Sequence, residues 1–369
     1  MVFQIKPVIK TMDSFKDFVA SYEIGEKDLI VTNEYIVKPL LGDDELKCHM
    51  LYQEKFGKGE PSDEMIDAML EKIKGLDIER VFAIGGGTVI DISKLFVFGG
   101  DYSCEDLYSF GKDLPKKRQL VIIPTTCGTG SEMTGLTIAE IKKKHTKLGL
   151  SLPQLFADET VMIDELLYSI PYGVFATSSI DALIHAIESF VSNKRSLYSD
   201  LFAEKAIRMI IAGYREVIEK GETAVKENIH DFLIASDLAG IAFSNAGCGA
   251  VHATSYPVGA NFHVPHGLAN YIMFTACFRA YAKNGADMED VEGVLKEVLN
   301  LDSGANPWEA LTELLDKILA RKPLKEVGMT KENISEFART VLETQGRLLG
   351  NMPVELSQSD LEEIYSECF

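Results

Sequence analysis

The sequence has little positive charge for its length. It contains 37 Lys and Arg residues against 56 Asp and Glu residues, so the 369-residue chain carries a formal net charge of −19. This charge repels phosphate backbones and anionic lipid surfaces, which argues against a protein that binds nucleic acid or membranes. An anionic ligand must therefore be held by a local arrangement of hydrogen-bond donors or cations.

The sequence also lacks the features of exported and membrane proteins. No run of 18 apolar residues occurs, which argues against a membrane span. The segment from Met1 to Phe15 has neither the apolar core nor the cleavage site of a secretion signal. The six cysteines are scattered without a CxxC pair, which is typical of reduced thiols, and we interpret Cys127 as a small residue in a tight loop. We therefore expect a cytoplasmic protein.

The first part of the chain has the pattern of an α/β domain. Short β-branched runs at 29–32, 80–84 and 120–123 alternate with helical patterns, of which 61–74 begins with the start signals Pro and Ser. This alternation predicts a parallel sheet with helices on both faces. Between residues 133 and 152 we expect a hairpin with a basic turn at Lys142–Lys144.

After Pro171 the pattern changes to that of helices. Apolar residues now recur at spacings of three and four, as in Leu183, Ile184 and Ile187. The sequence therefore predicts a Rossmann-like α/β domain over residues 1–172 and an all-helical domain over residues 173–369, consistent with the length of the chain.

A glycine-rich loop lies at one of the expected strand-to-helix turns. Gly85, Gly86 and Gly87 let a pyrophosphate approach the backbone, and the helix that follows from about Val89 offers free N–H groups. The spacing is not the GxGxxG of the usual dinucleotide fingerprint, so the turn alone is equally consistent with a tight connection. Asp91 follows on the same helix, and we include it among the expected cofactor contacts.

A second loop strengthens the prediction of a nucleotide site. It follows the strand at 120–123 and contains Thr125, Thr126, Thr129 and Ser131 together with two glycines. Hydroxyls and bare backbone at the carboxyl end of a strand suit phosphate, ribose or a nicotinamide amide. Helix capping by Ser131 or Thr129 is the alternative, and it accounts for one hydroxyl and not for four.

Four residues of the helical part have the chemistry of a metal site. Asp181 and His185 are four residues apart, so they share one face of a predicted helix, although an Asp there can also complement the helix dipole. His252 and His266 lie 14 residues apart in a segment whose prolines and glycine let the chain turn back. One carboxylate and three imidazoles are typical ligands of a first-row transition metal with a position open for substrate. We therefore predict a metal site in preference to buried core histidines.

These motifs carry a resemblance to a known family. The segments 85–91, 124–132, 181–188 and 252–267 resemble those of the iron-containing alcohol dehydrogenases, in the same order and over nearly the whole chain. The resemblance implies the two-domain architecture that this family shares with dehydroquinate synthase. Stretches 60–66 and 250–257 resemble the branch that interconverts 4-hydroxybutyrate and succinate semialdehyde.

The resemblance assigns roles to single residues. It implies that the four candidate ligands bind Fe²⁺ or sometimes Zn²⁺, and that NAD contacts Gly85, Gly86, Gly87, Thr88, Thr125, Thr129 and Lys147. It also implies a metal that polarises the substrate oxygen while hydride passes to the nicotinamide. Homo-oligomers are common in the family, and we expect one here.

Two departures from the family pattern leave questions open. Asn33 stands where the family often has an Asp that binds the adenosine ribose, so NADP is not excluded, although Glu34 beside it also carries negative charge. Tyr256 stands where many relatives have a histidine, so a proton-relay role does not transfer directly. We take Tyr256 and His263 as candidate catalytic residues, and the alternative for His263 is a structural role at a loop end.

Other functions stay open from the sequence. Within enzymes, these are a dehydrogenase of another small primary alcohol or diol and a metal-dependent cyclase or lyase that uses bound NAD. Outside enzymes, the alternative is a noncatalytic protein that binds a metal or a nucleotide. The expected partner is a small hydroxy acid or aldehyde.

Overall fold

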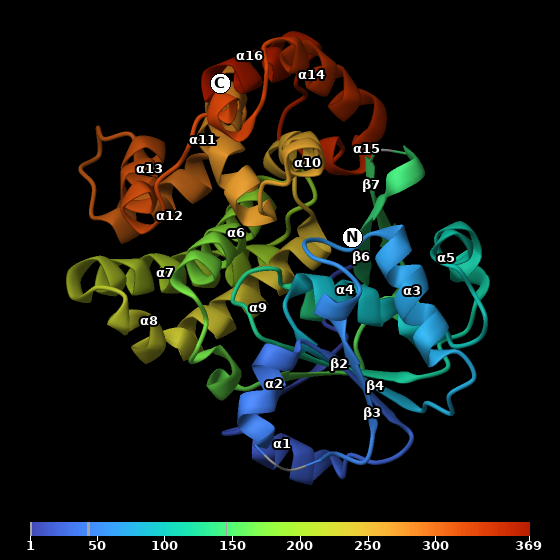
Figure 1. The fold of residues 1–369 in the computed structure, drawn as a ribbon. Helices are drawn as coiled ribbons and strands as arrows, with labels where there is room; N and C mark the ends of the chain where they lie inside the picture. The colour runs from blue at the N-terminus through green and yellow to red at the C-terminus, as the bar shows by residue number, and fades with distance from the viewer. Residues whose placement is uncertain (1, 43–44, 145) are drawn as a thin grey trace. The chain divides into compact units, whose positions relative to one another are not determined.

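The computed structural model describes residues 2–42, 45–144 and 146–369 and divides into two compact units (Figure 1). The α/β unit comprises Ile5–Ile170. The helical unit comprises Pro171–Phe369 together with the residues up to Gln4.

The α/β unit is built on a six-stranded parallel sheet in the order β1-β8-β5-β4-β2-β3. A separate antiparallel hairpin joins β6 to β7, and its turn is Lys142–Lys144, as the sequence predicts. The predicted strands at 29–32, 80–84 and 120–123 are confirmed. The strands are β1 (Val8–Thr11), β2 (Asp28–Thr32), β3 (His49–Tyr52), β4 (Arg80–Gly85), β5 (Gln119–Pro124), β6 (Leu136–Ile141), β7 (Thr146–Ser151) and β8 (Glu159–Met162).

Helices cover both faces of this sheet. Alternate residues of β4 point to opposite faces: Val81 joins a core cluster that includes Met65 and Ile90, and Phe82 packs edge-on against Phe18 with 5.6 Å between ring centroids. Ser62 caps the helix that contains Met65 by accepting a hydrogen bond from its backbone N–H. The helices are α1 (Phe15–Tyr22), α2 (Glu34–Leu41), α3 (Asp63–Ile73), α4 (Gly87–Leu95) and α5 (Cys104–Phe110), with short 3₁₀ turns at η1 (Gln53–Lys55), η2 (Phe96–Phe98), η3 (Gly111–Asp113), η4 (Ser131–Met133), η5 (Lys142–Lys144), η6 (Pro153–Leu155) and η7 (Asp164–Leu167).

The helical unit is organised around α6 (Tyr172–Val191), which packs against α7, α9 and α11. The residues described after Pro171 form helices, as the periodicity predicts. The other helices are α7 (Leu197–Lys220), α8 (Thr223–Glu227), α9 (Ile229–Ala246), α10 (Ala250–Phe262), α11 (His266–Lys283), α12 (Glu289–Leu299), α13 (Pro307–Ile318), α14 (Glu332–Thr344), α15 (Gly346–Leu349) and α16 (Gln358–Cys368), with a 3₁₀ turn at η8 (Leu324–Val327).

Burial accounts for the apolar character of α6. By length and composition α6 could cross a membrane, and α9 with α10 passes the same test when taken as one span bent by 106°. However, 83% of the apolar window of α6 is buried inside the structure. We therefore interpret α6 as a core helix. The six cysteines, all of which lie among the described residues, form no disulfide with one another, in agreement with the expected reduced thiols.

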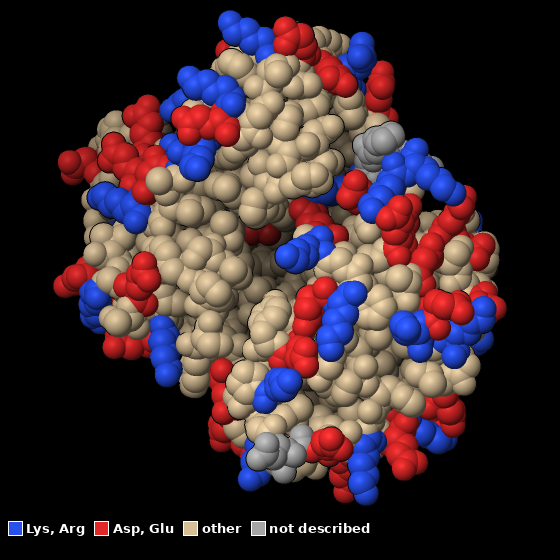
Figure 2. All heavy atoms as spheres, viewed as in Figure 1, with Lys and Arg blue, Asp and Glu red and all other residues tan. Residues whose placement is uncertain are grey.

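Figure 2 shows the charged side chains on one face of each unit. Lys and Arg side chains are interspersed there with Asp and Glu side chains. On the face drawn, the Lys and Arg side chains therefore lie near Asp and Glu side chains and do not gather into one large basic patch.

The packing of the sheet yields a stability prediction. Phe82→Ala should lower the free energy of unfolding by about 3–5 kcal/mol, because the ring is 0% exposed and the change leaves a cavity between β4 and α1. Tyr35→Ala is the control: its ring is 70% exposed on α2, so the change should stay within about 0.5 kcal/mol. Urea unfolding followed by circular dichroism measures both, and equal effects of the two substitutions would contradict the packing argument.

Candidate functional site

One face of α6 carries three acidic or imidazole side chains inside the core. Asp181, His185 and Glu188 follow at helical spacing and are 3%, 5% and 2% exposed. Buried polar groups of this kind are costly unless they are paired or bind a ligand. The residues that contact these three side chains therefore show whether they are paired within the protein or arranged to bind a ligand.

The other predicted ligands meet this face from α10 and α11. The ring of His252 stacks on that of His185 with 4.6 Å between centroids, and the ring of His266 lies 5.3 Å from that of His252. Donor atoms of Asp181, His252 and His266 all lie within 4.8 Å of one another. The structure thus brings together the four residues that the sequence predicts as ligands, although they come from three helices.

Asn270 is a further residue of this cluster. It is 0% exposed, and its Nδ2 lies 2.7 Å from Oδ1 of Asp181, 3.0 Å from Nε2 of His252 and 3.2 Å from Nε2 of His266. Its Oδ1 is buried and finds no hydrogen-bond partner among the described residues. The sequence analysis missed Asn270, although its position one helical turn after His266 is a usable signal.

Glu188 orients the histidine at the centre of the cluster. Its carboxylate contacts Nδ1 of His252, which leaves Nε2 to face Asp181 at 3.8 Å. Burial lowers the pKa of His252, but the neighbouring Cys248 and Glu188 outweigh it and raise that pKa well above its usual value. A carboxylate behind a metal-binding imidazole fixes the tautomer and increases its basicity. Glu188 was also missed, although it follows His185 by three residues on the same helix face.

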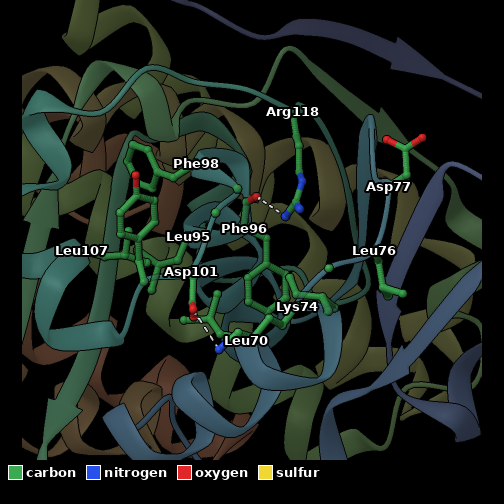
Figure 3. A pocket seen from close by; sticks show the side chains of 15 residues that line it. Leu70, Lys74, Leu76, Asp77, Leu95, Phe96, Phe98, Asp101, Leu107 and Arg118 are labelled. Atoms are coloured by element: carbon green, nitrogen blue, oxygen red, sulfur yellow. Dashed lines mark hydrogen bonds and ion pairs between the residues drawn. The ribbon is translucent and has the colours of Figure 1, made fainter.

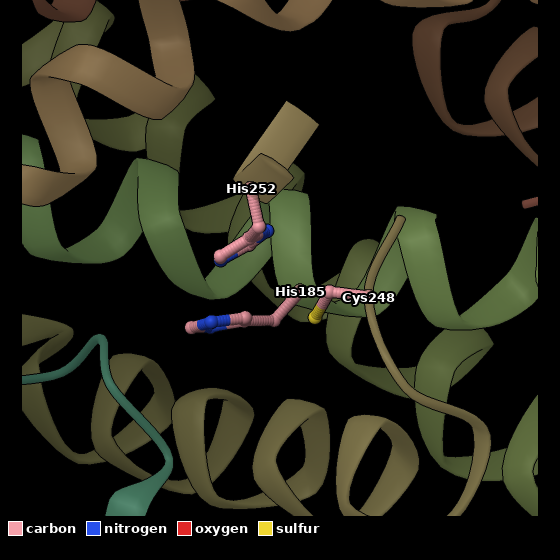
Figure 4. A group of neighbouring side chains, drawn as sticks. All are labelled: His185, Cys248 and His252. Atoms are coloured by element: carbon pink, nitrogen blue, oxygen red, sulfur yellow. The ribbon is translucent and has the colours of Figure 1, made fainter. Parts of the chain in front are cut away.

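Figure 4 shows the thiol of Cys248 beside the side chains of His185 and His252. Sγ of Cys248 and one ring nitrogen each of His185 and His252 lie within 4.8 Å of one another. Burial raises the pKa of the Cys248 thiol above its usual value. Cys248 precedes the start of α10, so helical periodicity gave no signal for it.

This donor set fits a transition metal. One carboxylate and three imidazoles match the ligand preference of Fe²⁺ or Zn²⁺. Burial raises the pKa of Asp181, but the neighbouring His185, His266 and His252 outweigh it and lower that pKa, so the group is an anionic donor. The unsatisfied oxygen of Asn270 and the carboxylate of Glu188 behind His252 are further features of a built site.

The two candidate catalytic residues differ in their placement. Tyr256 is 6% exposed, and its ring lies 5.9 Å from that of His266 between centroids. His263 ends α10 in the left-handed conformation (φ 53°), and its backbone N–H donates to the carbonyl of Gly259. Its side chain is exposed. The structure therefore brings Tyr256 to the cluster, and the contacts described for His263 are those of a helix end.

In the α/β unit the two predicted loops lie side by side. They follow the adjacent strands β4 and β5, and the backbone N–H of Thr125 donates to the carbonyl of Gly85 at 3.1 Å. A Cβ on Gly86 would lie 3.2 Å from Cγ2 of Thr126, and one on Gly87 would lie 2.8 Å from Cγ2 of Thr129. Close packing of the loops therefore requires these glycines. The arrangement also exposes the N-terminus of α4 at the carboxyl edge of the sheet, where nucleotides bind in such folds.

Asp91 lies in a buried polar network behind these loops. Its carboxylate accepts hydrogen bonds from Oγ of Ser131 at 2.5 Å and from the N–H of Ile138 at 2.9 Å. Lys94, which is 0% exposed, donates to Ser131 at 2.6 Å and to Thr134 at 3.1 Å, and burial lowers its pKa to about 8. These bonds give Asp91 a role in positioning the second loop, and its expected contact with the cofactor stays a prediction.

A short segment before α3 meets the other predicted cofactor residues. The hydroxyl of Thr88 donates to the carbonyl of Gly59 at 3.0 Å. Nζ of Lys147, which is 7% exposed, lies 2.5 Å from the carboxylate of Glu60. The structure thus places Thr88 and Lys147 on either side of residues 59–60. Glu60 was missed as a partner of Lys147, because it comes from a different element.

The α/β unit also has a cavity of about 500 Å³ at the amino ends of β4 and β5 (Figure 3). Lys74 pairs with Asp101 at 2.9 Å, and Arg118 donates to the carbonyl of Phe96 at 2.9 Å. None of the predicted site residues is among the described residues that line this cavity. It therefore lies away from the candidate nucleotide loops, which are at the carboxyl ends of the same strands.

Comparison with known proteins adds to this geometry. Residues 10–164 match the model of the family "iron-containing alcohol dehydrogenase", and residues 175–369 match that of its C-terminal part. The chain is 42% identical to 4-hydroxybutyrate dehydrogenase of Clostridium kluyveri over 100% of both chains. It is 31% identical to long-chain-alcohol dehydrogenase 1 of Geobacillus thermodenitrificans over 79% of this chain and 75% of that one. The solved structure of sulfoacetaldehyde reductase from Bifidobacterium kashiwanohense in complex with NAD⁺ has the same fold, with a TM-score of 0.82 and 24% identity over 99% of this chain and 98% of that one.

These matches define a class of protein, the oxidoreductases that act on CH–OH groups. The chain belongs to the iron-containing alcohol dehydrogenase family. The predicted family and fold class are confirmed.

Glu188 yields a prediction about metal affinity. Glu188→Gln should weaken metal binding about 10- to 100-fold, because it removes the charge that holds His252 in its ligand orientation. Competition with a chromophoric chelator, using Co²⁺ or Zn²⁺, measures the affinity. Glu219→Gln on the exposed face of α7 is the matched control, and a similar effect of both substitutions would contradict the role of Glu188.

Gly267 yields a second prediction about the same centre. A Cβ at this position would lie 2.1 Å from the carbonyl oxygen of Thr177, so Gly267→Ala should push the start of α11 away from α6. We expect a lower unfolding temperature and a loss of metal content, both measurable by differential scanning calorimetry and elemental analysis. Gly293→Ala on α12 is the control: a Cβ there meets nothing within 4 Å, and it should stabilise the protein by about 0.5–1 kcal/mol. A stable, metal-loaded Gly267→Ala protein would contradict this packing argument.

Proposed function

We propose that the protein interconverts 4-hydroxybutyrate and succinate semialdehyde with a nicotinamide dinucleotide as hydride carrier. The observation that carries the proposal is 42% identity over the full length to a protein named for this substrate. The cluster of one carboxylate and three imidazoles supports it, because it suits a metal that polarises an alcohol or carbonyl oxygen.

The roles of the metal-site residues follow from their positions. Asp181, His185, His252 and His266 would hold Fe²⁺ or Zn²⁺, which supplies a Lewis acid for the substrate oxygen when bound. Glu188 keeps Nε2 of His252 turned toward the site. We further propose that Tyr256, packed beside His266, orients the substrate, and that the exposed His263 exchanges protons with solvent.

The α/β unit would hold the dinucleotide. The N–H groups at the start of α4 suit the pyrophosphate, with Gly85, Gly86, Gly87 and Thr88 around them. Thr125, Thr126 and Thr129 of the second loop, together with Asn33 and Lys147, complete the proposed contacts. In this proposal residues 1–172 form the cofactor domain and residues 173–369 the metal domain. A cytoplasmic location and a homo-oligomer are part of the same proposal.

A second candidate activity is the oxidation of unsubstituted primary alcohols. It is favoured by 31% identity to a protein named as a long-chain-alcohol dehydrogenase. The two activities differ in the carboxylate at the far end of the substrate, which a site for 4-hydroxybutyrate must bind.

A comparison of two matched substrates tests the proposal. Protein loaded anaerobically with Fe²⁺ should oxidise 4-hydroxybutyrate with a kcat/KM about 100-fold or more above that for 1-butanol, because 1-butanol leaves the carboxylate-binding donors unpaired. The rates are obtained from the change in ultraviolet absorbance that accompanies formation of NADH or NADPH. Equal values for both substrates would favour the second candidate, and binding of cofactor and metal without turnover would favour a noncatalytic protein.

His266→Ala is the matching variant for the metal. It removes one of the four proposed ligands, so it should lower both the metal content and the turnover of 4-hydroxybutyrate. Full activity with full metal content in this variant would contradict the assignment of the site.

A further inference from the structure

A carboxylate from the turn after the edge strand β3 lies against Asn33, the residue that follows β2. Asn33, at the end of β2, is 5% exposed, and its Nδ2 donates to Oε2 of Glu54 at 3.0 Å and to Oε1 of Gln53 at 3.2 Å. The other carboxylate oxygen of Glu54 accepts a hydrogen bond from the N–H of Glu34 at 2.8 Å. Glu54 is therefore held by two donors from the end of β2.

The register of the sheet places this carboxylate at the nucleotide edge. Thr32 of β2 pairs with Ile84 of β4 on one side and with Tyr52 of β3 on the other. The residues that follow these positions, among them Asn33 and Gly85, therefore lie at the same level at the carboxyl edge of the sheet. Neighbouring strands are about 4.8 Å apart, so Glu54 lies within the reach of a dinucleotide bound at the start of α4.

The strand order of the sheet indicates which part of a dinucleotide would lie near Glu54. Strand order reverses between β2 and β4, because β3 lies beyond β2 and β5 lies beyond β4. In folds of this kind a dinucleotide lies across such a reversal, with its pyrophosphate at the glycine loop and its adenosine ribose at the end of the neighbouring strand. The neighbouring strand here is β2.

The charge at this position comes from Glu54 and not from Glu34. Glu34 lies 3.3 Å from Lys38 and 3.4 Å from Lys55, so its charge is compensated. The ion pairs found among the described residues do not include Glu54, whose hydrogen-bond partners are the neutral groups of Asn33 and the backbone. Glu54 thus places a negative charge without an ion-pair partner next to Asn33, whose own side chain is neutral.

We propose that Glu54 is the residue that makes the protein select NAD over NADP. Its carboxylate, held by Asn33, accepts a hydrogen bond from the 2′-hydroxyl of the adenosine ribose and repels a 2′-phosphate at the same place. Specificity of this kind combines an attraction for one ligand with a repulsion of the other. The inference rests on the proposed dinucleotide site, and it assigns the ribose contact to a carboxylate from the turn η1 that follows β3.

Binding measurements on the holoenzyme test this inference. Isothermal titration calorimetry with NAD⁺ and NADP⁺ should give a clear preference for NAD⁺ in the native protein. Glu54→Gln, which keeps the shape and an acceptor for Asn33, should reduce the ratio of the two affinities about 10- to 100-fold. The same shift should appear with the fragments 5′-AMP and adenosine 2′,5′-bisphosphate.

Glu34→Gln is the matched control, since it removes a neighbouring charge that is already paired with lysines. It should change the ratio less than about twofold. Equal binding of NAD⁺ and NADP⁺ by the native protein, or an unchanged ratio in Glu54→Gln with NAD⁺ still bound, would overturn the inference and leave the proposed function standing. Absence of binding by both dinucleotides to the native protein would overturn both.

Discussion

The helical unit depends on keeping an ionised carboxylate and its imidazole partners inside an apolar core. Asp181 is 3% exposed on a helix whose other buried residues are mainly apolar. Burying an isolated charge destabilises the folded state by roughly several kcal/mol unless the charge is paired and hydrogen-bonded. The arrangement of α10 and α11 around α6 supplies these partners as His252, His266 and Asn270. The packing of the three helices and the chemistry of the site therefore depend on each other.

The requirement explains features that lie outside the ligand set. Gly267 lets α11 approach the carbonyl of Thr177 closely, and this approach carries the neighbouring His266 toward Asp181. Glu188 uses the next turn of α6 to hold His252 from behind. Small and acidic residues at these positions thus serve the same geometry as the ligands themselves.

In the α/β unit, glycines and a buried charged residue position two loops. Its two loops need glycines because they pack against each other, and the buried Lys94 joins α4 to the second loop through Ser131. In the proposed function, the N–H groups at the start of α4 would face the pyrophosphate. The network behind the loops would then keep them rigid, and the backbone in front of it would supply the affinity for phosphate.

The sequence predicted what depends on local spacing. The alternation of strand and helix, the basic hairpin turn and the pairing of Asp181 with His185 on one helix face all follow from residues close in the chain. The same reasoning could have found Glu188 and Asn270, because each lies three or four residues from a predicted ligand. It could not have found Cys248, which precedes its helix, or the partnership of Lys147 with Glu60, which joins separate elements.

Asp91 and Glu54 show two limits of local reasoning. Asp91 lies in a motif typical of cofactor contacts, and the motif gives no sign of its bonds to Ser131 and Ile138, which come from separate elements. Glu54 lies in no motif, because its position next to Asn33 depends on β3 pairing with β2. Strand order was not predictable from the spacing of either strand, so the charge at this edge of the sheet could be recognised only in the folded chain.

The position of single charges at the carboxyl edge of the sheet matters more for a dinucleotide than the net charge of the chain. A net charge of −19 opposes any polyanion in general, yet the phosphates of a dinucleotide need only the N–H groups of a helix start. Lys147, a cation expected to contact the cofactor, already has Glu60 as a partner. In the proposal for Glu54, the additional phosphate that distinguishes NADP from NAD would meet a carboxylate that has no ion-pair partner among the described residues. The position of one carboxylate would then discriminate between two cofactors, which the total charge of the chain does not do.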